Sequence, residues 1–325
     1  MNAQRIEAAD YSGKPLETSA GRVLRVPAEC AGQRLDQALA GLLPEHSRSR
    51  LQAWMRAGRI RVDGAAADPK RKVWGGERID LGELPEAAAA ADAAEDIGIT
   101  AAFEDEAILV LAKPAGLVVH PGSGNAAGTL LNALLHHAPE LAAIPRAGIV
   151  HRLDKDTSGL MVVAKTLVAQ TDLVRQMQAR SVRRHYLALV HGEVAAGGEV
   201  NAPIGRHPQQ RTKMAVVAQG RAALTRYAPR EAFARATLLE CRLETGRTHQ
   251  IRVHMASIGH PLVGDPTYGR RRSGQSLLDA FPRQALHAWR LALVHPASGA
   301  EMSWEAAPPE DFAALLAALR AERGR

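Results

Sequence analysis

The strongest chemical signal in the sequence is a densely charged segment that directly precedes an apolar run at residues 160–164. Two carboxylates and three basic side chains, counting a protonated histidine, occur within six residues: His151, Arg152, Asp154, Lys155 and Asp156. Burying such a cluster is costly unless every charge is paired. A carboxylate held beside cations stays ionised and can act as a nucleophile or a general base. Asp154 is therefore the first catalytic candidate. The alternative is an aspartate that only caps a turn, bonded to the amides of Thr157 and Ser158.

A second candidate follows the strand-like run 236–243, in the segment from Glu244 to Arg252. The run ends at a glycine turn, and Thr248 is a plausible N-cap for the helix that we expect next. Arg247 would project from the strand end, where it could pair with Asp154. The alternative is an arginine that faces solvent.

Tyr186 is the third candidate, because it opens a strand-like run directly after three basic residues. A tyrosine beside cations is suited to stacking on a nucleic acid base. The pattern is equally compatible with an ordinary, half-buried strand aromatic.

A metal site is not expected. Four side chains could be imagined as ligands: His151, Asp154, His249 and His254. Their spacing matches no known ligand pattern, and two neighbouring cations, Arg152 and Lys155, would repel a metal ion. A glycine-rich phosphate loop is not recognisable either. The sequence therefore argues against a catalytic metal and against a nucleotide-binding phosphate loop.

The residues before the candidate site form a basic module with its own pattern of elements. Helical spacing predicts one helix over 34–43 and a second from Ser47 to Gly58, followed by strands at 59–62 and 77–81. Residues 46–72 contain eight basic residues and only two acidic ones. The basic residues are Arg48, Arg50, Arg56, Arg59, Arg61, Lys70, Arg71 and Lys72. A charge run is often only a solvated face. Here the cations come from a helix, a strand and a loop, as a surface that follows RNA phosphates would need.

Composition supports the same direction. The 325 residues carry a formal net charge of +7 with a pI of about 9.8, which favours a polyanionic partner. Two distant cysteines form no disulfide framework and fit a reducing compartment. No signal peptide or membrane span is recognisable, so we expect a cytoplasmic protein without membrane contact, and a monomer.

The domain prediction has four parts: a flexible tail at 1–21, an RNA-binding module at 22–82, an acidic alanine-rich linker at 83–96 and a catalytic domain at 97–325. In the last part we expect strands at 107–112, 160–164, 186–190, 222–227, 236–243 and 288–294. We expect helices at 128–137, 166–180, 248–258 and 309–323. Many strands with few helical crossovers predict an α+β fold, in which a mainly antiparallel mixed sheet has flanking helices.

These motifs match a known family. Residues 151–160 and 162–166 resemble the RluA-type RNA pseudouridine synthases. The similarity continues in 113–121, 186–192, 243–254 and 259–265, and residues 32–36 and 47–50 resemble a small α/β S4 RNA-binding domain. Residues 161, 206–208 and 214–216 resemble the D-type members in particular. The similarity covers roughly residues 20–310 in uninterrupted order.

The resemblance implies an isomerase that converts uridine in RNA to pseudouridine without a cofactor. Such enzymes break the N-glycosidic bond and rejoin C1′ of the ribose to C5 of the same uracil. The family's catalytic aspartate falls on Asp154, its arginine partner on Arg247 and its active-site tyrosine on Tyr186. Arg152 matches an arginine that helps to hold the displaced base. The implied partner is 23S ribosomal RNA or a precursor of the large subunit, at the stem-loop that faces the decoding centre.

Two other functions stay open at this level. The basic module alone would suit a non-catalytic RNA-binding assembly factor, and a metal-dependent RNA hydrolase would require strand cleavage that a chelator stops. The arginine-rich insert at 268–281, with Arg270, Arg271 and Arg272, suggests a mobile loop near RNA.

Overall fold

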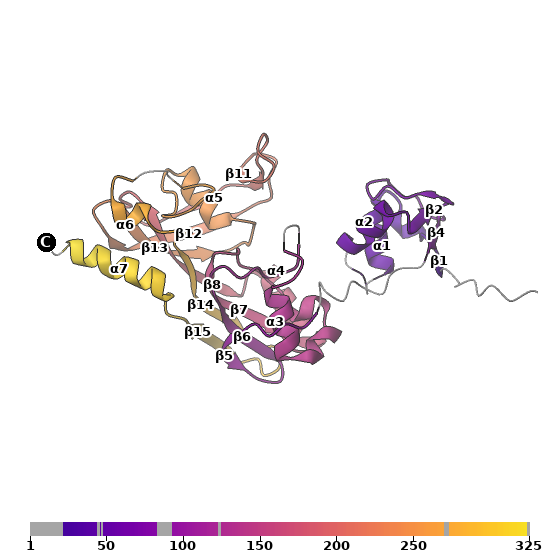
Figure 1. The fold of residues 1–325 in the computed structure, drawn as a ribbon, viewed down its shortest axis with the longest axis horizontal. Coiled ribbons are helices and arrows are strands. Elements are labelled where there is room, and N and C mark those ends of the chain that lie inside the picture. The colour runs from indigo at the N-terminus through magenta and orange to yellow at the C-terminus, as the bar shows by residue number, and fades with distance from the viewer. Residues whose placement is uncertain are drawn as a thin grey trace, which may run out of the picture. The chain divides into compact units, whose positions relative to one another are not determined.

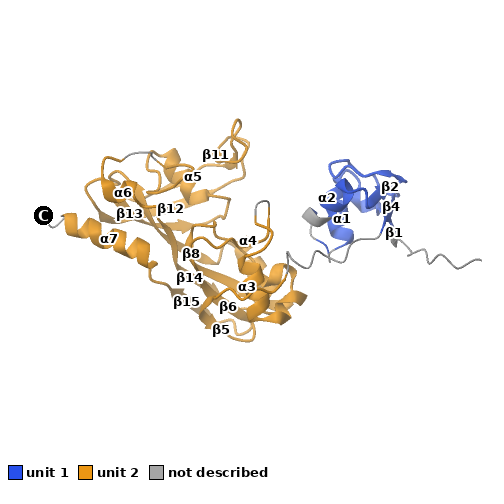
Figure 2. Cartoon of the chain, viewed as in Figure 1, with its two compact units in different colours: residues 1–88 blue, residues 89–325 orange. Residues whose placement is uncertain are grey.

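The computed structural model describes residues 22–43, 46, 48–82, 93–122, 125–269 and 273–323. The chain forms two compact units, residues 1–88 and 89–325 (Figure 2). The boundary falls inside the linker predicted at 83–96. Several predictions lie outside the described residues: the tail 1–21, the cap Ser47, the linker residues 83–92 and the arginines 270–272. In the described parts of the chain, no helix is long and apolar enough to cross a membrane.

Unit 1 packs two helices on a small antiparallel sheet with the strand order β1-β4-β2-β3. The helices are α1, Leu35–Leu42, and α2, Arg48–Arg56, and a short 3-10 turn lies at Ala28–Cys30. The strands are β1 (Arg22–Arg25), β2 (Ile60–Val62), β3 (Ala65–Ala66) and β4 (Arg78–Leu81). The Asp63-Gly64 turn joins β2 to β3, and both residues have positive φ, 52° and 78°, as this hairpin type requires.

Unit 2 is built on a nine-stranded sheet (Figure 1). The order is β5-β6-β7-β14-β8-β13-β12-β9, and β15 pairs with β14. The strands are β5 (Thr100–Glu104), β6 (Ile108–Lys113), β7 (Ser158–Ala164), β8 (Arg183–His191), β9 (Gly198–Asn201), β12 (Leu224–Ala232), β13 (Ala236–Leu243), β14 (Leu286–Val294) and β15 (Glu301–Glu305). A separate hairpin joins β10 (Ile204–Arg206) to β11 (Met214–Val216). Among the strand pairs of the described residues, only β7 and β14 run parallel, so the predicted mainly antiparallel sheet is confirmed.

Helices cover both faces of this sheet. They are α3 (Leu130–His137), α4 (Leu167–Ala179), α5 (Gln250–Ser257), α6 (Ser276–Asp279) and α7 (Glu310–Arg323), and two 3-10 turns lie at Pro139–Ala143 and Pro145–Gly148. Side chains alternate along β8: Tyr186 and Ala188 pack with residues of α3 and α5, whereas Leu187 and Leu189 pack with residues of α6 and α7. The sheet therefore has an α3–α5 face and an α7 face.

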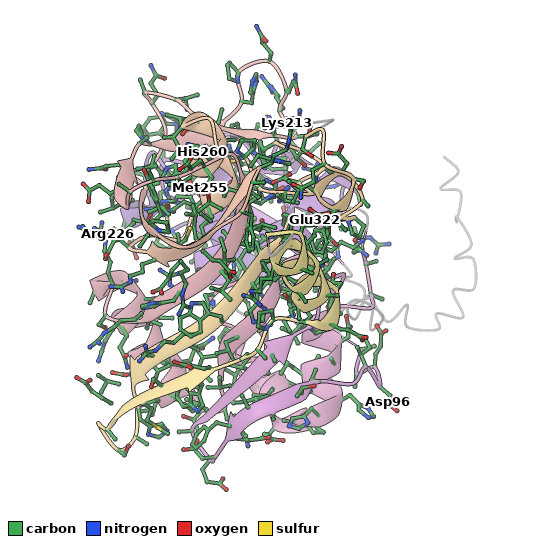
Figure 3. The ribbon with its side chains drawn as sticks, turned by 90° about the vertical axis from the view of Figure 1, so that its left-hand side faces the viewer. Asp96, Lys213, Arg226, Met255, His260 and Glu322 are labelled. Carbon is green, nitrogen blue, oxygen red and sulfur yellow. The ribbon has the colours of Figure 1, made fainter. Side chains whose placement is uncertain are left out.

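The end of α5 shows how the chain leaves this face. Gly259 has a φ of 87°, which a glycine adopts without strain. This conformation lets the amide of His260 donate to the carbonyl of Met255 at 2.9 Å; both residues are labelled in Figure 3. The helix predicted at 248–258 ends close to the expected position, at Ser257 with Ile258 as its C-cap.

Three local predictions differ from the structure. The residue that caps α5 is His249 in the left-handed region (φ 56°), and not Thr248. Part of the predicted linker belongs to unit 2, because the carbonyl of Ala93 accepts from Asn132 of α3 at 2.7 Å. The strand predicted at 222–227 continues to Ala232 through a bulge. The first two differences involve contacts between distant segments, of His249 with Tyr268 and of Ala93 with Asn132, which local spacing does not contain.

Candidate active site

The loop that carries Asp154 is held through its main chain. The buried ammonium of Lys113, at the end of β6, donates to the carbonyls of Pro114, Leu117 and Lys155 at 2.7, 2.9 and 2.9 Å. Burial lowers the pKa of this lysine to about 7. From the other side, Arg283 donates to the carbonyl of Asp156 at 3.0 Å. The segment before β7 is therefore fixed by two cations that leave the Asp154 side chain free.

Asp154 does not cap its own turn with its carboxylate. The amide of Thr157 donates to the main-chain carbonyl of Asp154 at 3.1 Å. The carboxylate instead accepts from Nη1 of Arg252 at 3.1 Å, and its side chain is 16 % exposed. An accessible carboxylate paired with a buried cation has the arrangement expected of a reactive group.

Arg252 is held between two aspartates. Its Nε and Nη2 donate to the two oxygens of Asp265 at 2.8 and 2.9 Å, which is a bidentate pair. Burial alone would lower the pKa of Arg252, but the two carboxylates raise it above its ordinary value. Burial would raise the pKa of Asp265, and the hydrogen bonds from Arg252 lower it instead. Asp265 thus fixes the arginine that meets Asp154.

The predicted pairing of Arg247 with Asp154 is wrong. Arg247 lies in the turn before α5, and its Nε donates to the carbonyl of Ala222 at 3.0 Å. Among the described residues it makes no ion pair. Because α5 begins only at Gln250, the residue that reaches Asp154 is Arg252 in the first turn of the helix.

Tyr186 lies near this pair. It is 4 % exposed, on the α3–α5 face of β8, opposite Cys241 of β13 and Ala288 of β14. Burial raises the pKa of its phenol, and the negative charge of Asp154 adds to the shift. A neutral tyrosine thus lies within electrostatic reach of the carboxylate.

The comparison with known proteins fits this geometry. The sequence model described as RNA pseudouridylate synthase matches residues 107–257, and the S4 domain model matches residues 33–79. Ribosomal large subunit pseudouridine synthase D of Nitrosomonas europaea is 57% identical over 97% of this chain and 94% of its own length. The protein of that name from Pseudomonas aeruginosa is 56% identical over 93% of this chain and 97% of its own.

The chain belongs to the RNA pseudouridylate synthase family. It is an enzyme of the isomerase class. The fold agrees: a solved structure named human RNA pseudouridylate synthase domain containing 4 has a TM-score of 0.54 and 27% identity, and covers 68% of this chain and 93% of its own.

Arg152 lies at the edge of this synthase site and is exposed. Its side chain has no hydrogen bond or ion pair within the described residues. Its charge contributes, after burial, to the lowered pKa values of His120 and His249. Within the described residues, Arg152 is therefore an unpaired cation in the loop that carries Asp154.

His249 and Tyr268 complete the surroundings of the ion pair. Nε2 of His249 lies 3.9 Å from a carboxylate oxygen of Asp154, and its Nδ1 is 2.9 Å from the hydroxyl of Tyr268. That hydroxyl also accepts from the amide of Met214 in β11 at 2.9 Å. The tyrosine ring lies 5.2 Å from the guanidinium of Arg252. One side chain thus links the β10–β11 hairpin to the ion pair.

The basic residues predicted for unit 1 divide into two groups. Arg48 pairs at 2.8 Å with the carboxylate of Asp36, whose side chain is fully buried, so this arginine has a structural partner. Arg71 lies 3.8 Å from Asp63. The others described are exposed: Arg56, Arg59, Arg61, Lys70 and Lys72. The side chain of Arg50 lies outside the described residues.

Sequence reasoning missed three of the residues that shape the site: Arg252, Asp265 and Lys113. All three stand in the segments that resemble the family, 243–254, 259–265 and 113–121. Only contacts between distant segments distinguish them from their neighbours. No three acidic, histidine or cysteine side chains of the described residues gather as a metal site would require.

Proposed function

We propose that this synthase isomerises uridine to pseudouridine in large-subunit ribosomal RNA, with Asp154 as the catalytic residue. The observation that carries the proposal is the pairing of Asp154 with Arg252 beside Tyr186. The relatives with 57% and 56% identity, which are named for the large ribosomal subunit, support this substrate. We propose the stem-loop that faces the decoding centre as the target region. The reaction needs no cofactor.

The isomerisation moves one bond and one proton. The bond between C1′ and N1 breaks, C1′ joins C5 of the same uracil, C5 loses its hydrogen as a proton and N1 gains one. The Asp154 carboxylate can start this sequence by attack at C1′, by attack at C6 of the uracil or by removal of the C2′ proton. Deuterium at C2′ separates the routes, because only proton removal gives a large primary isotope effect on the single-turnover rate.

The target base must leave the RNA stack to reach a carboxylate that is only 16 % exposed. Flipping a base costs a few kcal/mol and is least costly in a loop. In the proposed arrangement, Tyr186 packs on the uracil and assists loss of the C5 proton, and Arg152 holds the displaced base. The exposed cations of unit 1 bind phosphates, so that affinity falls steeply with salt.

The Asp154→Asn variant tests this proposal. It keeps the size of the side chain and an oxygen that can accept from Arg252, so we expect it to fold and to bind RNA. Tritium release from C5-labelled large-subunit RNA should be abolished. Full release by the variant would remove Asp154 as the catalyst. Release of no tritium by the wild-type protein would favour the assembly-factor alternative instead.

The biological target is a second part of the proposal. A deletion strain should lose pseudouridines from 23S RNA, and mapping them identifies the uridines. We expect modification in the cytoplasm, by a monomer, on 23S RNA or a precursor of the large subunit. The wild-type gene should restore the pseudouridines, whereas the Asp154→Asn gene should not.

A further inference from the structure

Arg184 is a buried cation that the fold does not pair. It is the second residue of β8 and is 8 % exposed. Within the described residues its guanidinium makes no hydrogen bond or ion pair, and its Nε is a buried donor without a partner. Burying an unpaired charge is strongly unfavourable. This cost indicates that Arg184 has a partner that is not part of the folded chain.

The guanidinium points toward the active site. Arg184 lies two residues before Tyr186, and residues at this spacing leave a strand on the same side. Its positive charge acts on the phenol of Tyr186 and on the ring of His151. A Cβ atom at position 246 would lie only 2.9 Å from Nη1 of Arg184. Glycine at this position thus leaves room for the guanidinium below the turn between β13 and α5.

Three further arginines surround this turn: Arg180, Arg221 and Arg247. Arg180 ends α4, and Arg221 lies in the loop before β12. After burial, the charges of Arg221 and Arg180 lower the pKa of Arg247, so each of these two arginines lies within electrostatic reach of Arg247. The acid of the turn, Glu244, is already 3.4 Å from Arg226, which is labelled in Figure 3. Within the described residues, none of the four arginines forms an ion pair with a carboxylate.

We propose that Arg184, Arg247, Arg180 and Arg221 bind a phosphodiester group of the RNA strand beside the target uridine. This site rests on the proposed function, because RNA supplies the phosphate. Guanidinium groups bind phosphate oxygens with paired, charge-assisted hydrogen bonds. Arg184 lies on the same face as Tyr186, so a phosphate bound to it adjoins the nucleotide that enters the active site. In this proposal Arg247 binds the RNA strand, whereas Arg252 forms the ion pair with Asp154.

Neutralising two of the more accessible members tests the site. We expect Arg247→Gln and Arg180→Gln each to raise the Kd for large-subunit RNA about 5- to 10-fold in filter binding, and to reduce the slope of log K against log salt by about 0.7–0.9. Arg242→Gln is the matched control, because this arginine pairs with Glu240 at 3.2 Å on the opposite face. It removes the same charge but should leave the Kd within about twofold. Identical binding by all three variants would overturn the site.

Arg184 offers a test that separates a ligand role from a structural one. In Arg184→Met the apolar volume is kept and no protein acceptor loses its donor. We therefore expect the melting temperature to stay the same or rise, while the Kd rises about tenfold or more. A lower melting temperature with unchanged Kd would refute the site. Tritium release by the wild-type protein is measured separately, so failure of the proposed function is distinguished from failure of the site.

Discussion

At the scale of single residues, the site depends on an arginine shared by two carboxylates. The fork of Arg252 meets Asp265 with two nitrogens and Asp154 with the third. A lysine presents one compact charge and cannot span both partners. Asp154 would then lose the fixed orientation that an effective attack requires.

We therefore expect Arg252→Lys to lower the single-turnover rate at saturating RNA by on the order of 100-fold, the loss that a misplacement of about 1 Å can produce. Rapid-quench measurement of pseudouridine formation checks this. Arg320→Lys is the control, because it makes the same substitution in an ion pair away from the site: Arg320 of α7 lies 2.7 Å from Glu231 of β12. Equal rates for the two variants would show that the shared fork does not matter.

A second prediction at this scale concerns acid stability. His151 accepts a hydrogen bond from the amide of Val162 at 3.1 Å, and burial, helped by the charge of Arg184, lowers its pKa from 6.5 to about 3. Between these values the unfolded chain holds a proton on this ring that the folded chain does not. The free energy of unfolding therefore falls as the pH falls through this window.

The variant His151→Gln can still accept from Val162 but does not titrate. The loss of unfolding free energy between pH 6.5 and 4.5 should shrink by about 2 kcal/mol, measured by urea titration at both pH values. If His151→Gln lost as much unfolding free energy between the two pH values as the wild-type protein does, His151 would not be the source of the acid sensitivity.

How much of the site could be foreseen varies from residue to residue. Asp154 and Tyr186 stand in short motifs at the start of strands, where local sequence predicts their place. The partner of Asp154 could not be chosen in this way, because Arg247 and Arg252 are five residues apart in the same segment. Which one reaches Asp154 depends on where α5 begins, and a left-handed His249 delays that start.

At the scale of elements, a glycine decides whether β7 can lie beside β14. Gly159 has a φ of 114°, and a Cβ atom there would lie 2.2 Å from the carbonyl oxygen of Ala288. This close approach allows the parallel pairing of Gly159 with Ala288 directly after the Asp154 loop. The short parallel contact therefore aligns the loop with the centre of the sheet.

We expect Gly159→Ala to lower the free energy of unfolding by more than about 3 kcal/mol, since both the backbone strain and the clash must be relieved. Gly116→Ala is a matched control, because Gly116 has a φ of 87° with open space around it. It should cost only about 1 kcal/mol. Chemical denaturation measures the free energy of unfolding of both variants. Equal losses would show that the close contact with Ala288 does not contribute to stability.

The elements themselves were largely predictable. Nearly continuous apolar runs located the central strands, and glycine or proline marked their ends. The edge strands β5 and β9 and the hairpin of β10 and β11 were not recognised. Their residues are half exposed, so burial leaves little pattern in them. Only pairing with a neighbour defines such strands.

At the scale of the whole molecule, the salt dependence of RNA binding depends on which cations are already paired with protein carboxylates. In unit 1, Arg61 and Lys72 are exposed and make no ion pair within the described residues, whereas the buried carboxylate of Asp36 holds Arg34 and Arg48. A cation that is already paired with a protein carboxylate releases few counterions when RNA binds. The unpaired cations should therefore dominate the salt dependence.

We expect Arg61→Gln and Lys72→Gln each to reduce the slope of log K against log salt by about 0.7–0.9 in RNA binding. Arg78→Gln is the control, because this arginine pairs with Asp80 at 2.8 Å. Arg48→Gln should instead lower the stability of unit 1 by about 1–3 kcal/mol, since Asp36 loses a donor. If Arg61→Gln, Lys72→Gln, Arg78→Gln and the wild-type protein all gave the same slope, Arg61 and Lys72 would not contact the RNA phosphates.

The position of β14 has a consequence for biosynthesis. This strand lies between β7 and β8 at the centre of the sheet, and its His287 is bonded to Ser158 at a separation of 129 residues. Contacts between residues this far apart in sequence form late in folding, because a long loop must first be ordered. The Asp154 loop can acquire its final support only after Leu286–Val294 has been synthesised. A nascent chain on a translating ribosome therefore stays inactive until nearly the whole protein has emerged.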